Sequence, residues 1–231
     1  MIEYCSDSSR AANEPLAGTA PQHDAFFLLE YREAWSPKVA KPGNNTLSAE
    51  VAAYVSEAAK ASTRNVRVNF IRQQGRTDGP LTAFVASVTG REPTLYRLSF
   101  ESYDDLLERP LQEVFDGAVK VEDRVDAPHY FVCTHKERDR ACGRDGWPVY
   151  TAFREQVGDA TWQTTHLGGH RFAATLLALP SGAMYGHVTV DDIQQIVTAH
   201  GRHDETYPIG GVYPLKLRGH VSHTPEVQAA L

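Results

Sequence analysis

Hydrophobic and polar positions divide the first half of the chain into predicted strands and helices. Four segments show the short apolar or alternating pattern typical of buried strands: Ala25–Tyr31, Val66–Ile71, Leu81–Val88 and Thr94–Phe100. Apolar residues at helical spacing follow Ser48, a suitable N-cap, and recur between Tyr103 and Phe115. The predicted order is strand, helix, strand, strand, strand, helix.

The second half repeats that order. Its predicted strands are His129–Cys133, Ala160–Thr165, Phe172–Leu179 and Ala183–Val188, and its predicted helices are Trp147–Val157 and Val190–His200. A βαβ unit followed by a ββα unit is the order of thioredoxin-like folds, so we predict an α/β protein with two thioredoxin-like halves. The charged connector Gly117–Pro128 sets the predicted boundary, with residues 1–120 in the first half and residues 121–231 in the second. A last short helix is predicted after Thr224.

Composition and charge indicate a soluble globular protein. The chain of 231 residues is 42% hydrophobic and 23% charged, and its formal net charge of −6 disfavours nucleic acids and anionic membranes as partners. It has no apolar run long enough to span a bilayer, and its N-terminus lacks the pattern of a signal peptide. We therefore expect a cytoplasmic protein without a membrane or nucleic-acid partner.

The chain has three cysteines, an odd number that does not support a disulfide framework. In a reducing compartment, cysteines that lie close together are more often metal ligands or catalytic thiols. Cys5 lies in a polar segment that ends near residue 24, and the expected role is a free thiol on a loosely held arm. The alternative is an arm folded back over the core or over a metal site.

Two residue pairs in the second half carry the candidate chemistry, and the first is Cys133 and Cys142. Cys133 ends a predicted strand, and Cys142 closes the polar loop that follows, just before the predicted helix. Loop residues at strand ends are held rigidly, and a thiolate near a helix N-terminus is stabilised by the helix dipole. Cations of this loop either offset thiolate charge and help to dock an acidic partner, or belong to a solvated hairpin of alternating charge.

The second pair is His166 and His170, which flank Leu-Gly-Gly. Two adjacent glycines disfavour a helix by about 1 kcal/mol each relative to alanine, so we predict a loop in which they allow close backbone approach and unusual backbone angles. We expect both histidines to be metal ligands. The other candidate ligands are His135, His187, His200, His203, His220 and His223.

The spacing favours a large inorganic group over zinc. Structural zinc sites usually take two cysteines that are two to four residues apart, whereas eight residues separate Cys133 from Cys142. A [2Fe–2S] cluster is larger and needs four protein ligands. Rieske proteins also combine two cysteines with two histidines, but each of their loops supplies one of each. Here the types are segregated, so we interpret one iron as bound by the cysteines and the other by the histidines.

Three segments resemble the sucrase/ferredoxin-like family of thioredoxin-like ferredoxins: Phe131–Gly143, Thr165–Ala174 and Leu179–Gly186. The resemblance implies a [2Fe–2S] cluster held by Cys133, Cys142, His166 and His170 in a thioredoxin-like domain. Related ferredoxins have a second cysteine pair in place of the two histidines. Thr175 departs from the family pattern, in which asparagine follows the Ala-Ala pair. No acid pair for glycoside hydrolysis is recognisable.

This ligand set predicts the charge of the cluster. Two ferric ions, two sulfides, two thiolates and two neutral imidazoles sum to zero, and one-electron reduction gives −1. Four thiolates would give −2 and −3, so the histidines should raise the reduction potential, as they do in Rieske centres. Reduction should also favour protonation of an imidazole, so the potential should fall as the pH rises through a histidine pKa.

We therefore expect a one-electron carrier or redox sensor rather than an enzyme, with redox proteins (a reductase and an acceptor) as partners. Two alternatives stay open. One is a thiol–disulfide oxidoreductase that uses Cys133 and Cys142, although the Cys-x-x-Cys motif is absent. The other is a structural zinc protein. The sequence leaves the oligomeric state open and predicts for the first half only that it packs against and shields the second.

Overall fold

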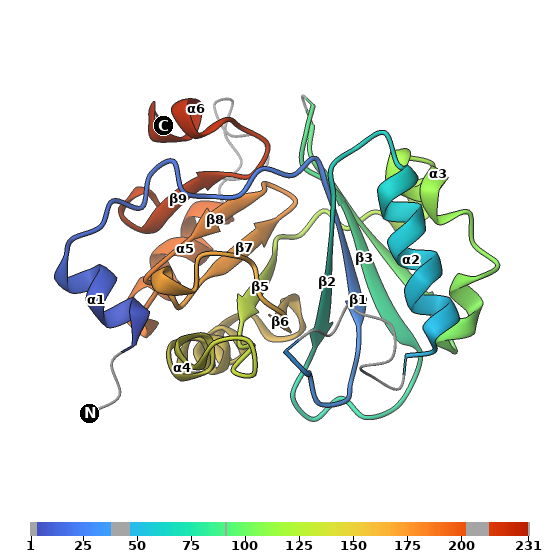
Figure 1. Ribbon diagram of the computed structural model, residues 1–231, viewed down its shortest axis with the longest axis horizontal. Helices are drawn as coiled ribbons and strands as arrows, with labels where there is room; N and C mark the ends of the chain where they lie inside the picture. The colour runs from blue at the N-terminus through green and yellow to red at the C-terminus, as the bar shows by residue number, and fades with distance from the viewer. Residues whose placement is uncertain (1–3, 38–46, 91, 202–212, 231) are drawn as a thin grey trace.

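The chain folds around one mixed sheet, to which the described residues contribute nine strands (Figure 1). The computed structural model describes residues 4–37, 47–90, 92–201 and 213–230. The strands are β1 Ala25–Glu30, β2 Val66–Arg72, β3 Leu81–Ser87, β4 Thr94–Phe100, β5 His129–Cys133, β6 Thr161–Thr164, β7 Leu176–Leu179, β8 Ala183–Tyr185 and β9 Leu217–His220. The α-helices are α1 Cys5–Ala11, α2 Ala49–Ala61, α3 Leu111–Asp116, α4 Arg140–Val157, α5 Ile193–His200 and α6 Pro225–Ala230. The predicted α/β class is confirmed.

The strand order is β4-β3-β1-β2-β6-β5-β7-β8-β9. In the first half β1 is parallel to β2 and antiparallel to β3, which is antiparallel to β4. In the second half β5, β6, β7 and β8 pair in the same way. The two parts are joined by an antiparallel contact of β2 with β6 that pairs Ile71 with Thr164 and Arg72 with Gln163. Because these are the last residues of both strands, the carboxyl ends of the two parallel pairs meet at one place.

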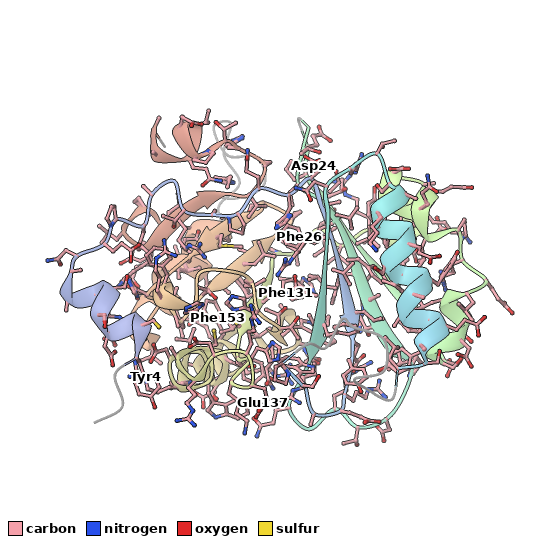
Figure 2. All side chains as sticks on the ribbon, in the orientation of Figure 1. Tyr4, Asp24, Phe26, Phe131, Glu137 and Phe153 are labelled. Carbon is pink, nitrogen blue, oxygen red and sulfur yellow. The ribbon has the colours of Figure 1, made fainter. Side chains whose placement is uncertain are left out.

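Strand β1 is buried on both faces, which explains its continuous apolar sequence. Phe27 and Leu29 pack in a core under α2 and α3, which cover one face of the first four strands (Figure 1). Phe26 and Leu28 face the other way, into a second core shared with β5, β6 and β7. There the ring of Phe84 contacts those of Phe131 and Trp162, with centroids 5.6 and 5.5 Å apart. Figure 2 shows Phe26 and Phe131 in the space between the two parts of the sheet.

The other face of the second half is covered by α4 and α5, whose apolar residues form a third core with β7 and β8. Helix α4 begins at Arg140, where Asp139 accepts a hydrogen bond of 2.9 Å from the Ala141 amide. The predicted start at Trp147 is therefore wrong. The glycines, charges and proline of this segment resemble a loop in sequence, but they form the first turns of the helix.

Other segments also differ from the sequence prediction; for example, β8 ends at Tyr185 instead of Val188, and α5 begins at Ile193 after a 3₁₀ turn at Val190–Asp192. The helix predicted from Tyr103 to Phe115 is a 3₁₀ turn at Tyr103–Leu106 followed by α3, because Pro110 has no amide hydrogen for a continuous helix. The strand predicted to begin at Phe172 begins at Leu176, after a 3₁₀ turn at His170–Phe172. The predicted irregular arm contains α1. Ser48 is confirmed as the N-cap of α2, since its hydroxyl accepts a hydrogen bond from the Val51 amide.

Candidate metal centre

Cys133 and Cys142 come together where β5 ends and α4 begins. Cys133 is the last residue of β5 and is wholly buried, and Cys142 lies in the first turn of α4 with 1% of its surface exposed. Gly146 permits this approach, because a Cβ atom there would lie 2.1 Å from the carbonyl oxygen of Cys133. Only a residue without a side chain lets α4 pack so closely on the end of β5.

His166 completes a group of three candidate ligands. The donor atoms of Cys133, Cys142 and His166 all lie within 4.8 Å of one another, and Cys142 Sγ is 3.7 Å from His166 Nδ1. A hydrogen bond from the Cys142 thiol, with a further contribution from His166, holds the pKa of Cys133 well below its usual range. The bond to Cys133 in turn raises the pKa of Cys142. A cation is therefore needed before both buried thiols can be thiolates, which is what a metal ion supplies.

The loop between the two histidines has two consecutive glycines in the left-handed region, with φ of 94° at Gly168 and 73° at Gly169. The predicted loop with unusual backbone angles is confirmed. A Cβ atom on Gly169 would lie 2.7 Å from the guanidinium of Arg218, which is 2% exposed. Arg218 donates hydrogen bonds to the carbonyl of Gly168 at 3.0 Å and to the hydroxyl of Thr19 at 3.0 Å. Burial lowers its pKa to about 10.

Two side chains of the first half also bind the segment that carries the histidines. Arg67 on β2 donates a 2.9 Å hydrogen bond to the carbonyl of His166. The amide of Asn69 donates to the hydroxyl of Thr165 at 3.0 Å. Burial lowers the pKa of Arg67, and the charge of Cys133 opposes this effect. Within the described ranges no carboxylate pairs with Arg67 or with Arg218, so a half-buried and a buried guanidinium group both donate hydrogen bonds to carbonyls of the histidine loop.

His170 lies beside this group but outside it. Its ring centroid is 5.8 Å from that of His166, its side chain is 46% exposed, and its Nε2 is 3.8 Å from a carboxylate oxygen of Asp139. The donor atoms of Cys5, Asp139 and His170 form a second group within 4.8 Å. Three of the four predicted ligands thus share one group, and the fourth adjoins it.

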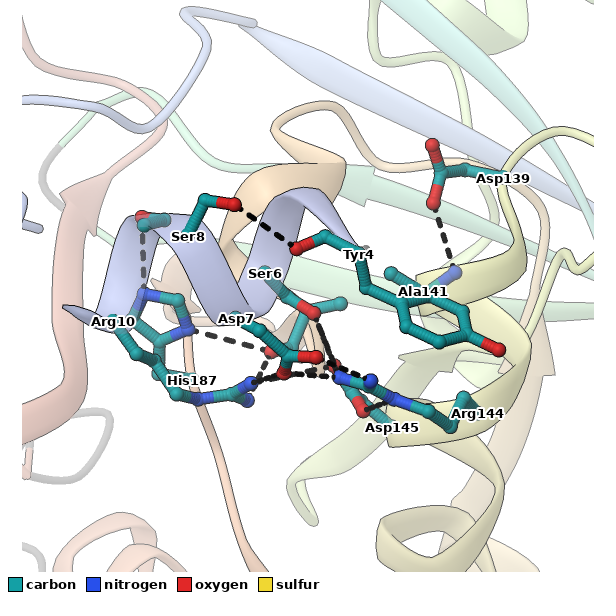
Figure 3. Close-up of polar contacts among 12 residues, drawn as sticks. Tyr4, Ser6, Asp7, Ser8, Arg10, Asp139, Ala141, Arg144, Asp145 and His187 are labelled. Carbon is teal, nitrogen blue, oxygen red and sulfur yellow. Dashed lines mark hydrogen bonds and ion pairs between the residues drawn. The ribbon is translucent and has the colours of Figure 1, made fainter. Parts of the chain in front are cut away.

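Cys5 is on an arm that packs tightly over this region. Helix α1 contacts the 3₁₀ turn that begins at His170. Ser6 donates a 2.7 Å hydrogen bond to Asp145, and Arg144 binds Asp7 at 2.6 Å (Figure 3). The expectation of a loosely held arm is therefore wrong, and the alternative of an arm folded over the site describes the structure.

The remaining described histidines belong to neither group. His135 is closest, but its Nδ1 accepts the His166 amide at 3.4 Å and its Nε2 donates to the Ser36 carbonyl at 3.0 Å. His187, His200 and His220 have protein hydrogen-bond partners as well. His203 lies outside the described residues.

The surroundings of Cys133 fit a metal-bound group. Thr164 on β6 is its cross-strand partner, and the carbonyl of Thr175 accepts its amide hydrogen at 3.0 Å. Both threonine hydroxyls are buried and have no hydrogen-bond partner in the described part of the chain. Buried orphan donors usually mark a missing acceptor, and sulfur atoms beside Cys133 would supply one.

The sequence reasoning missed Arg67, Asn69 and Arg218 as residues of the site. Arg67 and Asn69 are two residues apart on a strand expected to be buried, which puts two polar side chains on one face. That pattern is a usable signal. Arg218 has no comparable local signal, because its role depends on a loop far away in the sequence.

Comparison with known proteins gives one family match and a few structural likenesses. The sucrase/ferredoxin-like family model matches residues 16–219. A cysteine-to-serine variant of the thioredoxin-like [2Fe–2S] ferredoxin from Aquifex aeolicus is 19% identical, with a TM-score of 0.33, and the match covers 39% of this chain and 96% of that one. Another structure of a thioredoxin-like [2Fe–2S] ferredoxin from that organism is 21% identical, with a TM-score of 0.30, over 34% and 83% of the two chains.

No curated protein matches the chain. Of the helices in the described ranges, none has the length and hydropathy of a membrane span.

Proposed function

The chain belongs to the sucrase/ferredoxin-like family, and we propose that it is an electron-transfer protein with a [2Fe–2S] cluster bound by Cys133, Cys142, His166 and His170. The observation that carries the proposal is the group of two buried thiols and one imidazole within 4.8 Å, with a second imidazole ring 5.8 Å from the first. Four donors in two pairs are what such a cluster requires. We propose no substrate of its own for the protein.

The cluster would supply one-electron redox chemistry, and the surrounding residues would set its conditions. Burial of Cys133 and Cys142 keeps water from the thiolates. Arg67 and Arg218 place two positive charges behind the histidine loop, which favours the more negative, reduced state. His170 is the more exposed of the two histidines, so this side of the site is open to solvent. By the charge count above, His166 or His170 would take up a proton when such a cluster is reduced.

The test is analysis of protein purified without oxygen. The proposal expects a visible absorption spectrum, with two irons and two acid-labile sulfides per chain. His166→Cys and His170→Cys should keep a cluster but lower its potential and flatten the pH dependence of the potential. His223→Cys, which changes an exposed histidine outside both groups, is the matched control.

Each alternative has a different outcome in the same experiment. A colourless protein with one zinc would show a structural zinc site. A metal-free protein with reactive thiols would show an oxidoreductase, although both thiols are almost completely buried and exchange requires an accessible thiol. An unchanged spectrum and potential in both histidine variants would mean that other residues are the ligands.

A further inference from the structure

A cleft of about 610 Å³ lies directly beside the two cysteines. It opens where the carboxyl ends of the two parallel strand pairs meet, which is where α/β proteins usually bind their partners or ligands. The first half contributes Trp35 and Arg72, and the second half contributes Thr134, His135 and the first turns of α4. Figure 2 shows Glu137 at this end of the molecule, between α4 and the strands of the first half.

The cleft is positively charged in a protein of negative net charge. Its lining holds four cations, Arg72, Lys136, Arg140 and Arg144, and the carboxylate of Glu137, while Asp7 and Asp145 bind Arg144. Cations outnumber carboxylates by one. The chain as a whole carries a formal charge of −6. The charge at this face is therefore opposite in sign to that of the molecule.

The acidic groups at the start of α4 already have partners, including Glu137, which lies 3.9 Å from Lys136. Asp139 caps the helix, and Asp145 binds Ser6 and Arg144 (Figure 3). Arg138 and Arg140 are exposed and make no side-chain hydrogen bond or ion pair with any described residue. The uncommitted charge at this end of α4 is thus cationic.

Aromatic side chains accompany these cations. Trp147 on α4 is 41% exposed at the cleft, and it is one of the few large apolar side chains at the surface of the described chain. Arg72 stacks on Trp35 at 4.3 Å, and Arg144 stacks on Tyr4 at 4.0 Å. Tryptophan, tyrosine and arginine are the residue types that contribute most to protein–protein binding.

We propose that this face, the docking face, binds the acidic surface of a redox partner protein. It consists of the cleft, whose lining includes Arg140, Trp147 and Trp35, and of the exposed Arg138 two residues before Arg140. The inference rests on the proposed function and deepens it, because it names the chemistry of the partner and the route of the electron. Thr134 follows Cys133 and Gly143 follows Cys142, and both line the cleft. A partner seated there is one residue along the chain from each cysteine.

The position of the free cations favours a protein over a small anion. Arg138 and Arg140 are exposed and have no ion-pair partner among the described residues, whereas Arg72 and Arg144 are already satisfied by their own neighbours. Rim charges accelerate the encounter of two proteins and contribute little to holding a buried anion. Short-lived electron-transfer complexes are small and depend on such steering.

The experiment uses reduced flavodoxin, an acidic electron-transfer protein, as the probe. Binding to the protein as isolated is measured by Trp fluorescence or calorimetry, which does not require a cluster. The rate of cluster reduction is measured by stopped flow, with dithionite as the reductant that needs no docking. The variant is Arg138→Glu with Arg140→Glu. The matched control, Lys60→Glu with Arg97→Glu, makes the same charge change at exposed positions of the first half.

At low ionic strength the docking-face variant should bind flavodoxin with at least about tenfold lower affinity, and flavodoxin should reduce its cluster at least about tenfold more slowly. The rate of reduction by dithionite should be unchanged. The difference should shrink to about twofold in 0.5 M salt. Trp147→Ala should weaken binding at both salt concentrations, because it removes contact area rather than charge. Circular dichroism checks that the variants are folded, and Arg138→Gln with Arg140→Gln should give an intermediate effect.

Three outcomes would overturn the proposal: equal loss in the first-half control, no loss in the docking-face variant, or saturation of the cleft by flavin mononucleotide alone. The last outcome would show a nucleotide site. A protein that lacks a cluster would refute the proposed function, while the binding measurement would still decide the docking face.

Discussion

Each half of the sheet buries an ionisable side chain at the end of the first strand of its βαβ unit. The two side chains differ in whether a charged partner balances them. In the first half Glu30 ends β1 with its side chain wholly buried, and it binds Arg32 at 2.8 Å, Arg76 at 2.9 Å and the Thr82 amide at 2.9 Å. In the second half Cys133 ends β5, equally buried, and faces a second thiol and an imidazole.

This comparison distinguishes a buried charge that stabilises the fold, Glu30, from a buried thiol whose charge has no such partner, Cys133. The charge of Glu30 is balanced by residues of its own half, so that half is complete without a ligand. The second half has two buried thiols and no lysine or arginine of its own bonded to them in the described chain. Its fixed cation, Arg67, comes from the first half. The ligand-free half therefore does more than shield the site.

The largest effect should come from Gly146→Ala. The added Cβ would collide with the backbone of Cys133, so α4 must move away from β5 and the two cysteines must separate. We expect a loss of more than about 4 kcal/mol in the free energy of unfolding, together with loss of iron. Denaturant titration and iron analysis measure both. Gly201→Ala, at a right-handed position after α5, is the control and should cost less than about 1 kcal/mol.

Glu30→Gln and Cys133→Ser test the comparison directly. The first change leaves two arginines without a carboxylate and should destabilise the metal-free protein by about 3 kcal/mol while iron binding persists. The second should change metal-free stability by only about 1 kcal/mol and abolish the cluster. Unfolding curves of the metal-free variants and their iron content after reconstitution give the result. Loss of iron in Glu30→Gln, together with a large loss of metal-free stability in Cys133→Ser, would contradict the comparison of the two halves.

Acid should weaken the second half through His200. Burial lowers the pKa of His200 to about 3, and its ring pairs with the hydroxyl of Tyr185 at 2.7 Å. Because the folded pKa lies below the unfolded value of about 6.5, the neutral ring contributes its full stability above pH 6.5 and loses it as the pH falls towards 3. We expect about 2 kcal/mol of loss between pH 7 and 5 in the metal-free protein. His200→Gln should reduce that slope, because other histidines whose pKa burial lowers still contribute to it. An unchanged slope would show that His200 does not cause the acid sensitivity.

The smallest effect concerns Arg67, the cation that the first half places near Cys133. Arg67→Met removes a positive charge near Cys133 and the hydrogen bond to His166, so the reduction potential should fall by about 60 mV, or about 1.4 kcal/mol for one electron. Arg67→Lys should recover part of that loss. Arg97→Met, at an exposed position of β4, should leave the potential unchanged. Spectroelectrochemical titration measures the reduction potentials of all three variants. Equal potentials would show that the first half packs against the site without changing its reduction potential.

Local sequence patterns predicted the elements well where packing agrees with local preference. Strands β4 and β5 have the predicted bounds, and α2 begins at the predicted cap. The start of α4 could not be read in this way, because glycine, proline and charge disfavour a helix locally while contact with β5 stabilises it. Packing of α1 on the rest of the chain decides its structure in the same manner.

For the site, the sequence brought Cys133, Cys142 and His166 into one prediction, and the structure places them together. The assignment of all four ligands stays a prediction. The polar pair Arg67 and Asn69 on one face of a buried strand signals a polar site, but it does not identify the partner loop, because Arg67 and His166 are 99 residues apart along the chain. No periodicity encodes which strand ends will meet.

The core shared by the two parts of the sheet has a consequence for protein engineering. Phe26, Leu28 and Phe84 on one side pack against Phe131 and Trp162 on the other, so a cut in the connector would leave each fragment with a bare aromatic face. Neither fragment would make a soluble minimal module. Co-expressed, however, the two should find each other through that face, and their reassembly would bring Arg67 back to the histidine loop. With the proposed cluster, the protein would then act as a split reporter whose colour appears only when both fragments assemble.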